Sequence, residues 1–320
     1  MTVPYEILKV AKDIEEMRIR GAGPIASSAL RALADSLDEI CVQSRSSEDF
    51  FAEIRSAEET LLNTRPTAVA LPNAISFVDN ALVQSREKGE EKEQMRNVVE
   101  RAIGEFLDRM ERAKTMVADI GVKLIPRGTS VMTHCHSTVV ISLLKKAVET
   151  GAISTIYVKE TRPLYQGLIT ARQLSGFGGD VRLIVDSASA YYMDQVDMVV
   201  VGADAIALNG DVANKIGTFQ TAIVARQFNK RFLVAAETYK IAPKAGSGKE
   251  IPIEFRGADE VVSDSRVIET GLKVLNPSFD VTPHKAIDWI VTEMRVLSGD
   301  LPRGVAALAN EAGLIPLKPF

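Results

Sequence analysis

The sequence predicts an α/β protein in which an all-helical N-terminal domain, residues 1–120, precedes a Rossmann-like domain with a parallel sheet, residues 121–320. Up to Gly121, apolar residues recur at helical spacing, and beyond it short apolar runs alternate with helical stretches. A chain of 320 residues is also long enough to form two cores of unequal size.

The first two predicted helices, residues 4–18 and 25–42, are separated by a short segment rich in small residues. In it Arg20 precedes Gly21, Ala22 and Gly23. Small residues let backbone amides approach an oxyanion, so this loop could hold a phosphate. A helix–helix turn also uses glycine, and spacing alone favours that simpler interpretation.

A predicted third helix ends near Thr64 and is followed by Arg65 and Pro66. Proline disfavours the helical conformation in the residue before it, and a fourth helix is predicted to begin near Ala68. Arg65 could bind a phosphate through two parallel hydrogen bonds, or it could be an ordinary exposed charge. A charged connector over residues 85–94 then leads into one long helix over residues 95–120.

Five short apolar runs predict the strands of the second domain. They are rich in valine and isoleucine, as expected for parallel strands that are covered on both faces, and lie at residues 130–133, 155–158, 181–185, 198–201 and 232–235. Right-handed crossovers bring the carboxyl ends of such strands to one edge. The residues after the runs should therefore be neighbours: 135–137, 160–163, 186–188, 202–204 and 237–240.

Cys135 stands between the first predicted strand and a helix that opens at Ser137. Helix amides favour anions and can lower a thiol pKa, although a free cysteine is as often a small buried apolar residue. The flanking His134 and His136 suggest a metal site. Adjacent strand residues point to opposite faces, however, so the three side chains could hardly share one ion and no metal is predicted.

Asp204 directly follows another predicted strand. Burial there would raise the pKa of the carboxyl and let it carry a proton near neutral pH, but a capping or turn aspartate is an equally good interpretation. A turn at residues 209–211 then leads to Asn214 and Lys215, and a helix begins near Gly217. Neither a Walker-type loop nor a dinucleotide fingerprint is present, so no cofactor is predicted.

Composition narrows the possible partners. The formal net charge of -4 argues against a general nucleic-acid binder, and no apolar run is long enough for a membrane span. Cys41 and Cys135 suggest no disulfide framework, and residues 1–16 lack the apolar core of a signal peptide. We therefore expect a cytoplasmic protein.

Several segments together resemble the superfamily that joins aldose-phosphate isomerases to the regulatory subunits of translation initiation factor 2B. The resemblance spans nearly the whole chain and rests on residues 20–23, 64–69, 133–137, 160–163, 202–204 and 209–218. The translation-factor subunits generally lack the cysteine and aspartate pair that stands here as Cys135 and Asp204. Methylthioribose-1-phosphate isomerases typically have Arg-Gly-Ala-Pro in the first loop and Cys-Asn after the strand. Here Gly23 and His136 stand at those points, as in the archaeal ribose-1,5-bisphosphate isomerases.

The resemblance implies an enzyme that converts ribose 1,5-bisphosphate to ribulose 1,5-bisphosphate in AMP breakdown. In it Cys135 is the base that takes the proton from C2, and Asp204 relays protons through an enediolate-like intermediate. The helix start and the cations give a reason for a lowered thiol pKa, which apolar burial opposes. The implied substrate-binding residues are Arg20, Gly21, Ala22, Gly23, Arg65, Ser137, Thr138, Val139, Asn214, Lys215 and Lys240.

A bisphosphate needs an anion site at each end, and cations stand in both domains, so the substrate is expected in a cleft between them. The same resemblance implies a homo-oligomer, either a dimer or a trimer of dimers. Two alternatives stay open: a methylthioribose-1-phosphate isomerase, and a non-enzymatic regulatory subunit related to translation initiation factor 2B.

Overall fold

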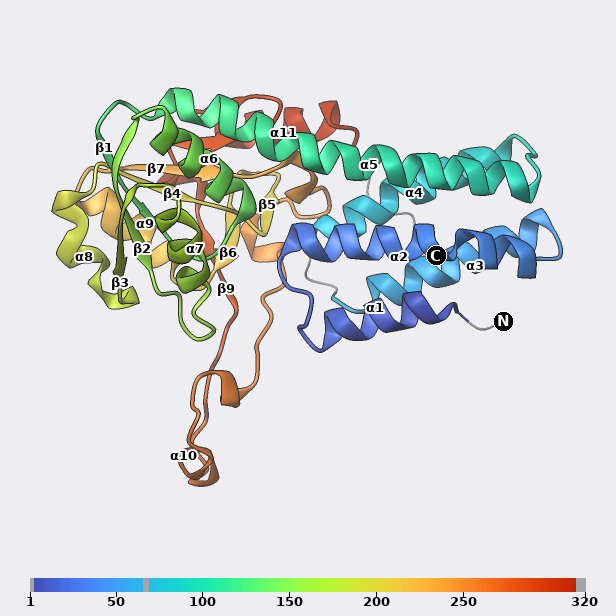
Figure 1. Cartoon of the computed structure of the whole chain (residues 1–320), viewed down its shortest axis with the longest axis horizontal. Coiled ribbons are helices and arrows are strands. Elements are labelled where there is room, and N and C mark those ends of the chain that lie inside the picture. Colours follow the sequence, from blue (N-terminus) through green and yellow to red (C-terminus); the bar gives the residue numbers. More distant parts are fainter. Residues whose placement is uncertain (1–2, 66–68, 315–320) are drawn as a thin grey trace. The chain divides into compact units, whose positions relative to one another are not determined.

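The computed structural model describes residues 3–65 and 69–314 (Figure 1). These residues form two compact units, one that runs up to Arg112 and also includes Gly313 and Leu314, and one over Ala113–Ala312. The first is helical and the second is built on a mostly parallel sheet, so the predicted fold class is confirmed.

The helical unit contains α1 (Tyr5–Glu15), α2 (Ala22–Gln43), α3 (Ser47–Leu62), α4 (Ala70–Glu87) and the first part of α5 (Lys92–Gly121). One stripe of each helix is apolar and buried, for example Ile7 and Ile14 of α1 and Leu30 and Leu33 of α2. The predicted charged connector is shorter than expected, because α4 continues to Glu87 and α5 already begins at Lys92. The predicted start of the fourth helix near Ala68 lies outside the described residues.

Helix α2 begins earlier than the sequence predicts. Gly21 is its N-cap with φ 90°, so Ala22 and Gly23 lie in the first helical turn and not in a loop. The reason is Pro24, which lies in the first turn of α2, whereas the sequence predicts the helix only from residue 25. A proline is tolerated in the first turn because the N–H it lacks has no partner within the helix there.

The second unit is built on a seven-stranded sheet with the order β11-β10-β7-β4-β1-β2-β3, in which only β11 is antiparallel to its neighbour. The strands are β1 (Thr129–Thr133), β2 (Ile153–Lys159), β3 (Asp180–Ile184), β4 (Met198–Val201), β7 (Arg231–Ala235), β10 (Trp289–Val291) and β11 (Val296–Ser298). The five predicted runs correspond to β1, β2, β3, β4 and β7.

Several helices lie between or after the strands of this sheet in the sequence. They include α6 (Thr138–Glu149), α7 (Gln166–Ser175), the short α8 (Ser189–Tyr192), α9 (Thr218–Gln227) and α11 (Leu301–Glu311). The apolar face of α6 and the last turns of α5 pack on β1, β2 and β4 in one buried cluster that includes Val131, Leu143 and Val200. Edge strand β3 differs from the expectation of burial on both faces, since Leu183 is 49% exposed.

A second, smaller sheet has the order β8-β5-β6-β9 and was not predicted. Its strands are β5 (Ala205–Ala207), β6 (Val212–Lys215), β8 (Ile241–Ala242) and β9 (Phe279–Thr282). Strands β5 and β6 form a hairpin whose turn contains Gly210 with φ 81°, the left-handed conformation that glycine adopts without strain. This hairpin connects Asp204 to Asn214 and Lys215.

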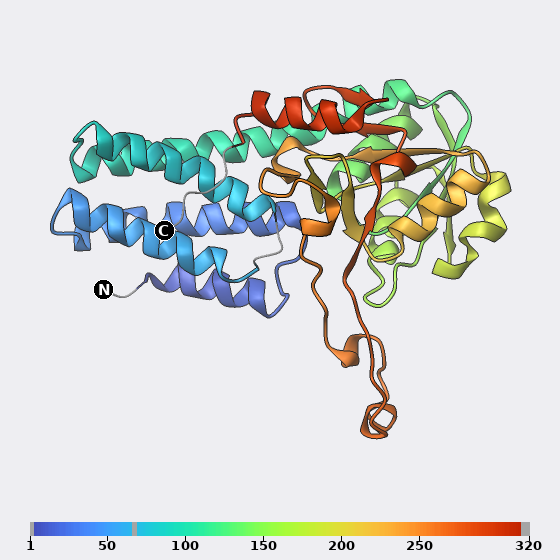
Figure 2. The same cartoon turned by 180° about the vertical axis from the view of Figure 1, so that it is seen from behind.

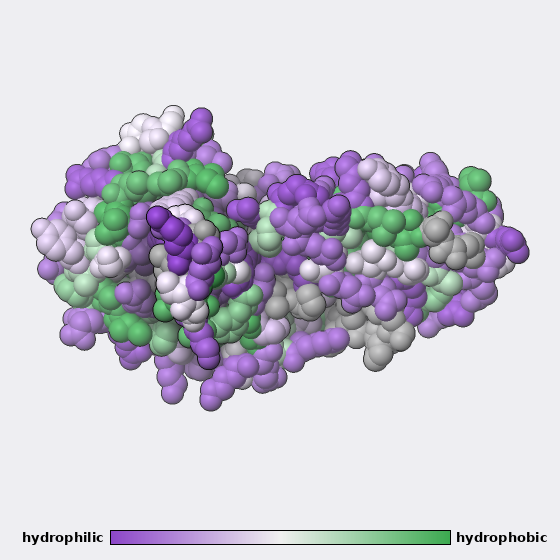
Figure 3. Space-filling view, turned by 90° about the horizontal axis from the view of Figure 1, so that it is seen from below, coloured by the Kyte–Doolittle hydropathy of each residue, from purple (hydrophilic) through white to green (hydrophobic). Residues whose placement is uncertain are grey.

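Between β8 and β9 the chain makes a long excursion that carries the short helix α10 (Ser265–Glu269) and extends away from the sheets (Figures 1 and 2). Polar and apolar side chains are interspersed on the face drawn in Figure 3. Within residues 3–65 and 69–314, none of the helices combines the length and the apolar character needed to cross a membrane.

Candidate active site

The strand order brings Cys135 and Asp204 to the same edge of the large sheet. Strands β2 and β3 lie on one side of β1, and β4, β7 and β10 lie on the other, so the order reverses between β1 and β4. Open α/β sheets bind ligands outside the carboxyl ends of the strands at such a point. Cys135 follows β1 and Asp204 follows β4, so both lie at this crevice.

Cys135 is a half-buried free thiol with φ 71°. Burial raises the pKa of Cys135 to about 11, while the positive charge of Lys215 opposes this increase and the carboxylate of Asp204 adds to it. The lowering that the helix start and the cations were expected to produce is therefore outweighed, because burial has the larger effect. Asp204 and Lys215 are therefore close enough for their charges to act on the thiol.

The start of α6 lies beside the thiol. Ser137 caps the helix, and its Oγ accepts a hydrogen bond from the Val140 amide at 3.5 Å. Thr138 and Val139 form the first turn, whose amides have no carbonyl partner within the helix and can bind an anion. Gly202, two residues before Asp204, packs directly against Ser137.

Asn214 and Lys215 end strand β6 and are both buried. The Asn214 side-chain amide donates to Thr218 Oγ1 at 3.0 Å, and Lys215 Nζ lies 4.9 Å from the centre of the Phe279 ring. Burial lowers the pKa of Lys215, whereas the nearby Cys135 and Asp204 favour its charged form. Lys215 is thus a partly desolvated cation beside the thiol.

His134 connects the cysteine to the segment that carries Lys215. Burial and the charge of Lys159 lower the pKa of His134 to about 3, so the ring is neutral. Its Nε2 donates to the Ile216 carbonyl at 2.8 Å, and its Nδ1 lies 3.3 Å from Thr161 Oγ1. His136 Nδ1 lies 3.1 Å from Thr170 Oγ1. Across the residues that the structure describes, no three His, Cys, Asp or Glu side chains form a possible metal site.

Lys240 lies near the carboxyl end of β7 and is also buried. Its Nζ forms an ion pair with Glu237 Oε2 at 2.8 Å. Burial would raise the pKa of Glu237, but the charge of Lys240 and its hydrogen bond bring that pKa below its ordinary value. A phosphate bound by Lys240 would therefore share this cation with Glu237.

The remaining predicted residues lie in the helical unit. Arg20 is exposed, and its Nε donates to the Met17 carbonyl at 2.5 Å. Gly21 is exposed, Ala22 is buried and Gly23 is half-buried at the start of α2. Arg65 follows the end of α3 and is 8% exposed, so the expectation of an ordinary exposed arginine is wrong.

Four residues without a role in the sequence analysis support the site. Thr161 Oγ1 accepts a hydrogen bond from the Cys135 amide at 2.9 Å, and Asp186 accepts bonds from the amides of Thr161 and Arg162. Asp280 accepts bonds from the Gly217 and Phe219 amides, and Lys159 contacts Gly217 and Thr221. Thr161 and Asp186 lie in segments 160–163 and 186–188, which directly follow predicted strands. This position was the one sequence signal that pointed to them.

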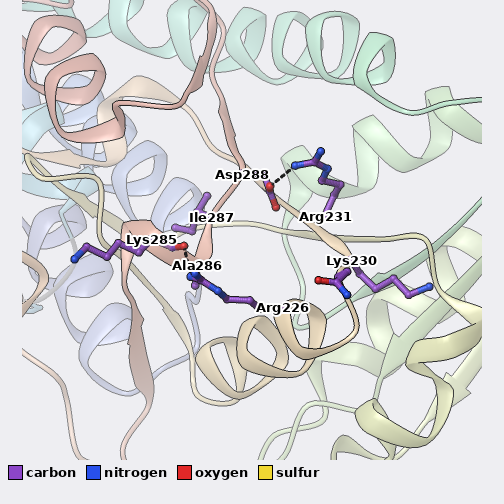
Figure 4. A pocket seen from close by; sticks show the side chains of 8 residues that line it. Arg226, Lys230, Arg231, Lys285, Ala286, Ile287 and Asp288 are labelled. Atoms are coloured by element: carbon purple, nitrogen blue, oxygen red, sulfur yellow. Dashed lines mark hydrogen bonds and ion pairs between the residues drawn. The ribbon is translucent and has the colours of Figure 1, made fainter.

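A basic pocket lies at the opposite end of the strands of the large sheet (Figure 4). It is lined by residues at or just before the starts of β7 and β10, including Lys230, Arg231 and Lys285. Arg231 pairs with Asp288 at 2.7 Å, and Arg226 donates to the Lys285 carbonyl at 2.6 Å. Because β7 and β10 run parallel to β4, this pocket lies at the amino ends of the strands and is separate from Cys135.

Comparison with known proteins finds a family model, a sequence relative and two solved structures that resemble this chain. A family model described as "Initiation factor 2 subunit family" matches residues 18–299. A ribose 1,5-bisphosphate isomerase of Archaeoglobus fulgidus is 44% identical over 296 residues, which cover 92% of this chain and 91% of that protein.

Two solved structures have similar folds. The crystal structure of 5-methylthioribose 1-phosphate isomerase from Pyrococcus horikoshii OT3 has a TM-score of 0.79 and 32% identity, and the match covers 95% of this chain and 88% of that one. The translation initiation factor eIF-2B of Pyrococcus horikoshii OT3 has the same TM-score with 27% identity, over 94% and 99% of the two chains.

Proposed function

The chain belongs to the initiation factor 2 subunit family, and from that premise we propose that it is an aldose–ketose isomerase that converts ribose 1,5-bisphosphate to ribulose 1,5-bisphosphate. The observation that carries the proposal is the position of Cys135 and Asp204 after the neighbouring strands β1 and β4. A thiol and a carboxylate at one crevice can supply the proton transfers that this reaction requires. The similarity to the Archaeoglobus isomerase supports the choice of substrate.

In the proposed mechanism Cys135 is the base. Opening of the sugar ring adds a proton to the ring oxygen at C4. Cys135 then removes the proton from C2 and returns it to C1, and the C2 hydroxyl gives up its proton and becomes the ketone. Asp204 moves protons on the sugar oxygens through an enediolate-like intermediate. Lys215, whose charge acts on Cys135 and whose charged form Asp204 favours, stabilises the negative charge that develops on this intermediate.

The protonation state of the thiol limits the rate of the proposed reaction. With a pKa of about 11, only a small part of Cys135 is thiolate at neutral pH, and this part grows about tenfold with each pH unit. We therefore expect kcat/KM to rise with pH over the neutral and mildly alkaline range, as for a base that must lose a proton in the free enzyme.

The phosphates of the substrate are proposed to bind two groups of cations. Arg20 and Arg65 belong to the helical unit, and Lys215 and Lys240 belong to the sheet unit. The proposed set is completed by the Asn214 side chain and by the backbone at the starts of two helices. These backbone segments are Gly21, Ala22 and Gly23 at α2, and Ser137, Thr138 and Val139 at α6. The buried Lys215 and Lys240 are the stronger candidates in the sheet unit, because a desolvated cation attracts an anion more strongly.

The test is turnover of two sugar phosphates in parallel by the purified protein. Ribose 1,5-bisphosphate should give ribulose 1,5-bisphosphate, and methylthioribose 1-phosphate should give little or no product. Failure to convert the bisphosphate would overturn the proposal. Conversion of methylthioribose 1-phosphate alone would favour the second candidate, a methylthioribose-1-phosphate isomerase. The similarity to the Pyrococcus horikoshii structure of such an enzyme motivates this candidate.

A non-enzymatic regulatory subunit is the third candidate, and the fold shared with translation initiation factor eIF-2B motivates it. A scaffold needs neither a half-buried thiol at the switch point nor a carboxylate beside it. Specific co-purification with initiation factor 2, together with inactivity on both sugars, would select this candidate.

We further propose that the reaction belongs to AMP breakdown, that it takes place in the cytoplasm without a cofactor, and that the protein is a homo-oligomer. A dimer or a trimer of dimers is expected from the family resemblance. Light scattering coupled to size-exclusion chromatography would give the mass of the assembly, and a mass equal to one chain would contradict the proposed oligomer.

A further inference from the structure

Lys159 is a charged residue in the interior of the sheet unit that the proposed mechanism does not use. It is the last residue of β2, and none of its surface is exposed. Its Nζ donates to Thr221 Oγ1 at 2.8 Å and to the Gly217 carbonyl at 3.5 Å. Burying an ammonium group is costly, and a hydrophobic residue would fill the same space without that cost, so its presence needs an explanation.

The segment that Lys159 contacts is the one that carries Lys215. Gly217 has φ 98°, and its carbonyl also accepts a hydrogen bond from Thr221 Oγ1 at 2.7 Å. Its amide donates to Asp280 at 2.7 Å, and the preceding carbonyl accepts the bond from His134. A Cβ at Gly217 would lie 3.2 Å from His134 Nε2 and 3.7 Å from Lys159 Nζ, so the backbone is closely packed here.

These contacts form a chain that leads to the cysteine. Thr161 Oγ1 lies near the His134 ring and accepts a hydrogen bond from the Cys135 amide. His134 contacts the residue before Gly217, and Lys159 contacts Gly217 itself. The thiol and Lys215 are therefore held on one hydrogen-bonded framework, with Lys159 on the side of the framework next to α9.

We propose that Lys159 is a positioning residue for the isomerase reaction: its ammonium group holds the Gly217 turn and thereby fixes Lys215 relative to Cys135 and Asp204. This inference rests on the proposed function. It goes beyond it by giving a catalytic consequence to a side chain that touches neither the thiol nor the proposed substrate.

The charge of Lys159 should change in the mildly alkaline range. Burial lowers the pKa of Lys159 to about 8, while Asp186 and Asp280 favour the charged form. A hydrogen bond from a charged donor is stronger than one from a neutral amine. The hold on Gly217 should therefore weaken as the pH rises through about 8.

Other titratable groups surround Lys159, and they can be separated from it. His134 follows β1, Asp186 follows β3, Asp280 comes from β9 and Lys215 from β6. The pKa of His134 is about 3 and that of Asp280 is about 6, both below the window around pH 8. The pKa of Lys215 is also lowered, so only a variant of Lys159 distinguishes the two lysines.

The test compares wild type, Lys159→Met and Lys159→Gln, with Lys123→Met, which removes an exposed lysine, as the matched control. Hydrogen exchange of the backbone over residues 214–219 measures the hold on the turn without reference to activity. KM and kcat for ribose 1,5-bisphosphate, measured from pH 6.5 to 9.5, give the catalytic consequence.

In Lys159→Met the amides of residues 214–219 should exchange faster, and KM at pH 7 should rise about tenfold, the change that corresponds to the loss of one hydrogen bond of ordinary strength. Wild-type KM should increase as the pH passes through about 8, whereas KM of Lys159→Met should stay at the higher value throughout. Lys159→Gln, which keeps a neutral donor, should recover part of the affinity and show no step near pH 8.

Unchanged exchange in Lys159→Met would overturn the inference whatever the activity. A step in KM that persists in Lys159→Met would assign the titration to Lys215 and would also overturn it. Absence of turnover in wild type contradicts the proposed isomerase and not the hold on the turn, which the exchange measurement decides separately.

Discussion

Gly202 and Ser137 lie so close together that a Cβ at Gly202 would be 2.7 Å from Ser137 Oγ and 2.8 Å from Ser137 Cβ. Gly202 follows β4 and Ser137 caps α6, the helix that follows β1. The two sides of the switch point are therefore in van der Waals contact close to Cys135 and Asp204. Any side chain at residue 202 must displace the cap of α6.

Gly202→Ala should impair catalysis more than its size suggests. The added methyl group would push Ser137 away from the α6 amides and shift Asp204, two residues along the chain. We expect kcat/KM for ribose 1,5-bisphosphate to fall at least tenfold, and stability to fall by about 1–3 kcal/mol, the usual cost of overpacking. Steady-state kinetics and guanidinium unfolding measure the two effects.

Gly104→Ala is the matched control for that substitution. Gly104 lies within α5 with nothing within 4 Å of the added Cβ. Alanine favours a helix interior by roughly 0.5–1 kcal/mol over glycine, so this variant should be slightly more stable and fully active. Equal kinetic losses in both variants would show that the contact between Gly202 and Ser137 has no special effect.

The rate at which the Cys135 thiol is alkylated should show how far burial raises its pKa. In a Cys41→Ser background, where Cys135 is the remaining cysteine of the sequence, alkylation by iodoacetamide measures the thiolate. Because burial raises the pKa of Cys135 to about 11, the rate should keep rising with pH beyond 9. At pH 8 the thiolate population should be roughly a hundredfold smaller than that of a free thiol. A rate that levels off at or below pH 8.5 would contradict the effect of burial.

Acid should destabilise the protein through His134. Its folded pKa of about 3 lies below the unfolded value of roughly 6.5. The folded state therefore resists protonation, so this contribution to stability is complete above pH 6.5 and is lost as the pH falls through that window. Between pH 7 and 4.5 the loss from His134 should be roughly 2–3 kcal/mol.

His134→Gln isolates this effect, since a glutamine amide can donate to the Ile216 carbonyl without titrating. Guanidinium unfolding of both proteins at pH 7 and pH 4.5 gives the comparison. The variant should lose less stability on acidification than wild type by that amount. If both proteins lose the same amount, His134 is not the group responsible.

The large sheet could be predicted because its buried strands carry a strong local signal. Residues 198–201 are an uninterrupted apolar run, and β4 has those bounds. The shared edge that carries Cys135 and Asp204 followed from parallel strands alone, since their carboxyl ends must lie together. The strand order, and with it the switch point between β1 and β4, was not predicted. Strand β3 was predicted to be covered on both faces because a sequence does not reveal which strand lies at the edge of a sheet.

The small sheet could not be predicted, because strands of two to four residues are too short to show a period. The supporting residues of the site were missed for a different reason. Asp280 holds Gly217 across 63 positions of sequence, and Thr161 holds the Cys135 amide across 26. Such roles depend on pairings between distant segments, and no local pattern of residue types encodes them.

The most direct test of the account is the rate of ribulose 1,5-bisphosphate formation by wild type and Cys135→Ser at equal concentration, with folding of both verified by circular dichroism. A serine hydroxyl is a far weaker base than a thiolate but occupies similar space. If Cys135 removes the C2 proton, wild type turns over and kcat of Cys135→Ser falls roughly 10²–10⁴-fold, the usual contribution of a general base. A folded Cys135→Ser protein that keeps its turnover within a few-fold of wild type would contradict the central claim.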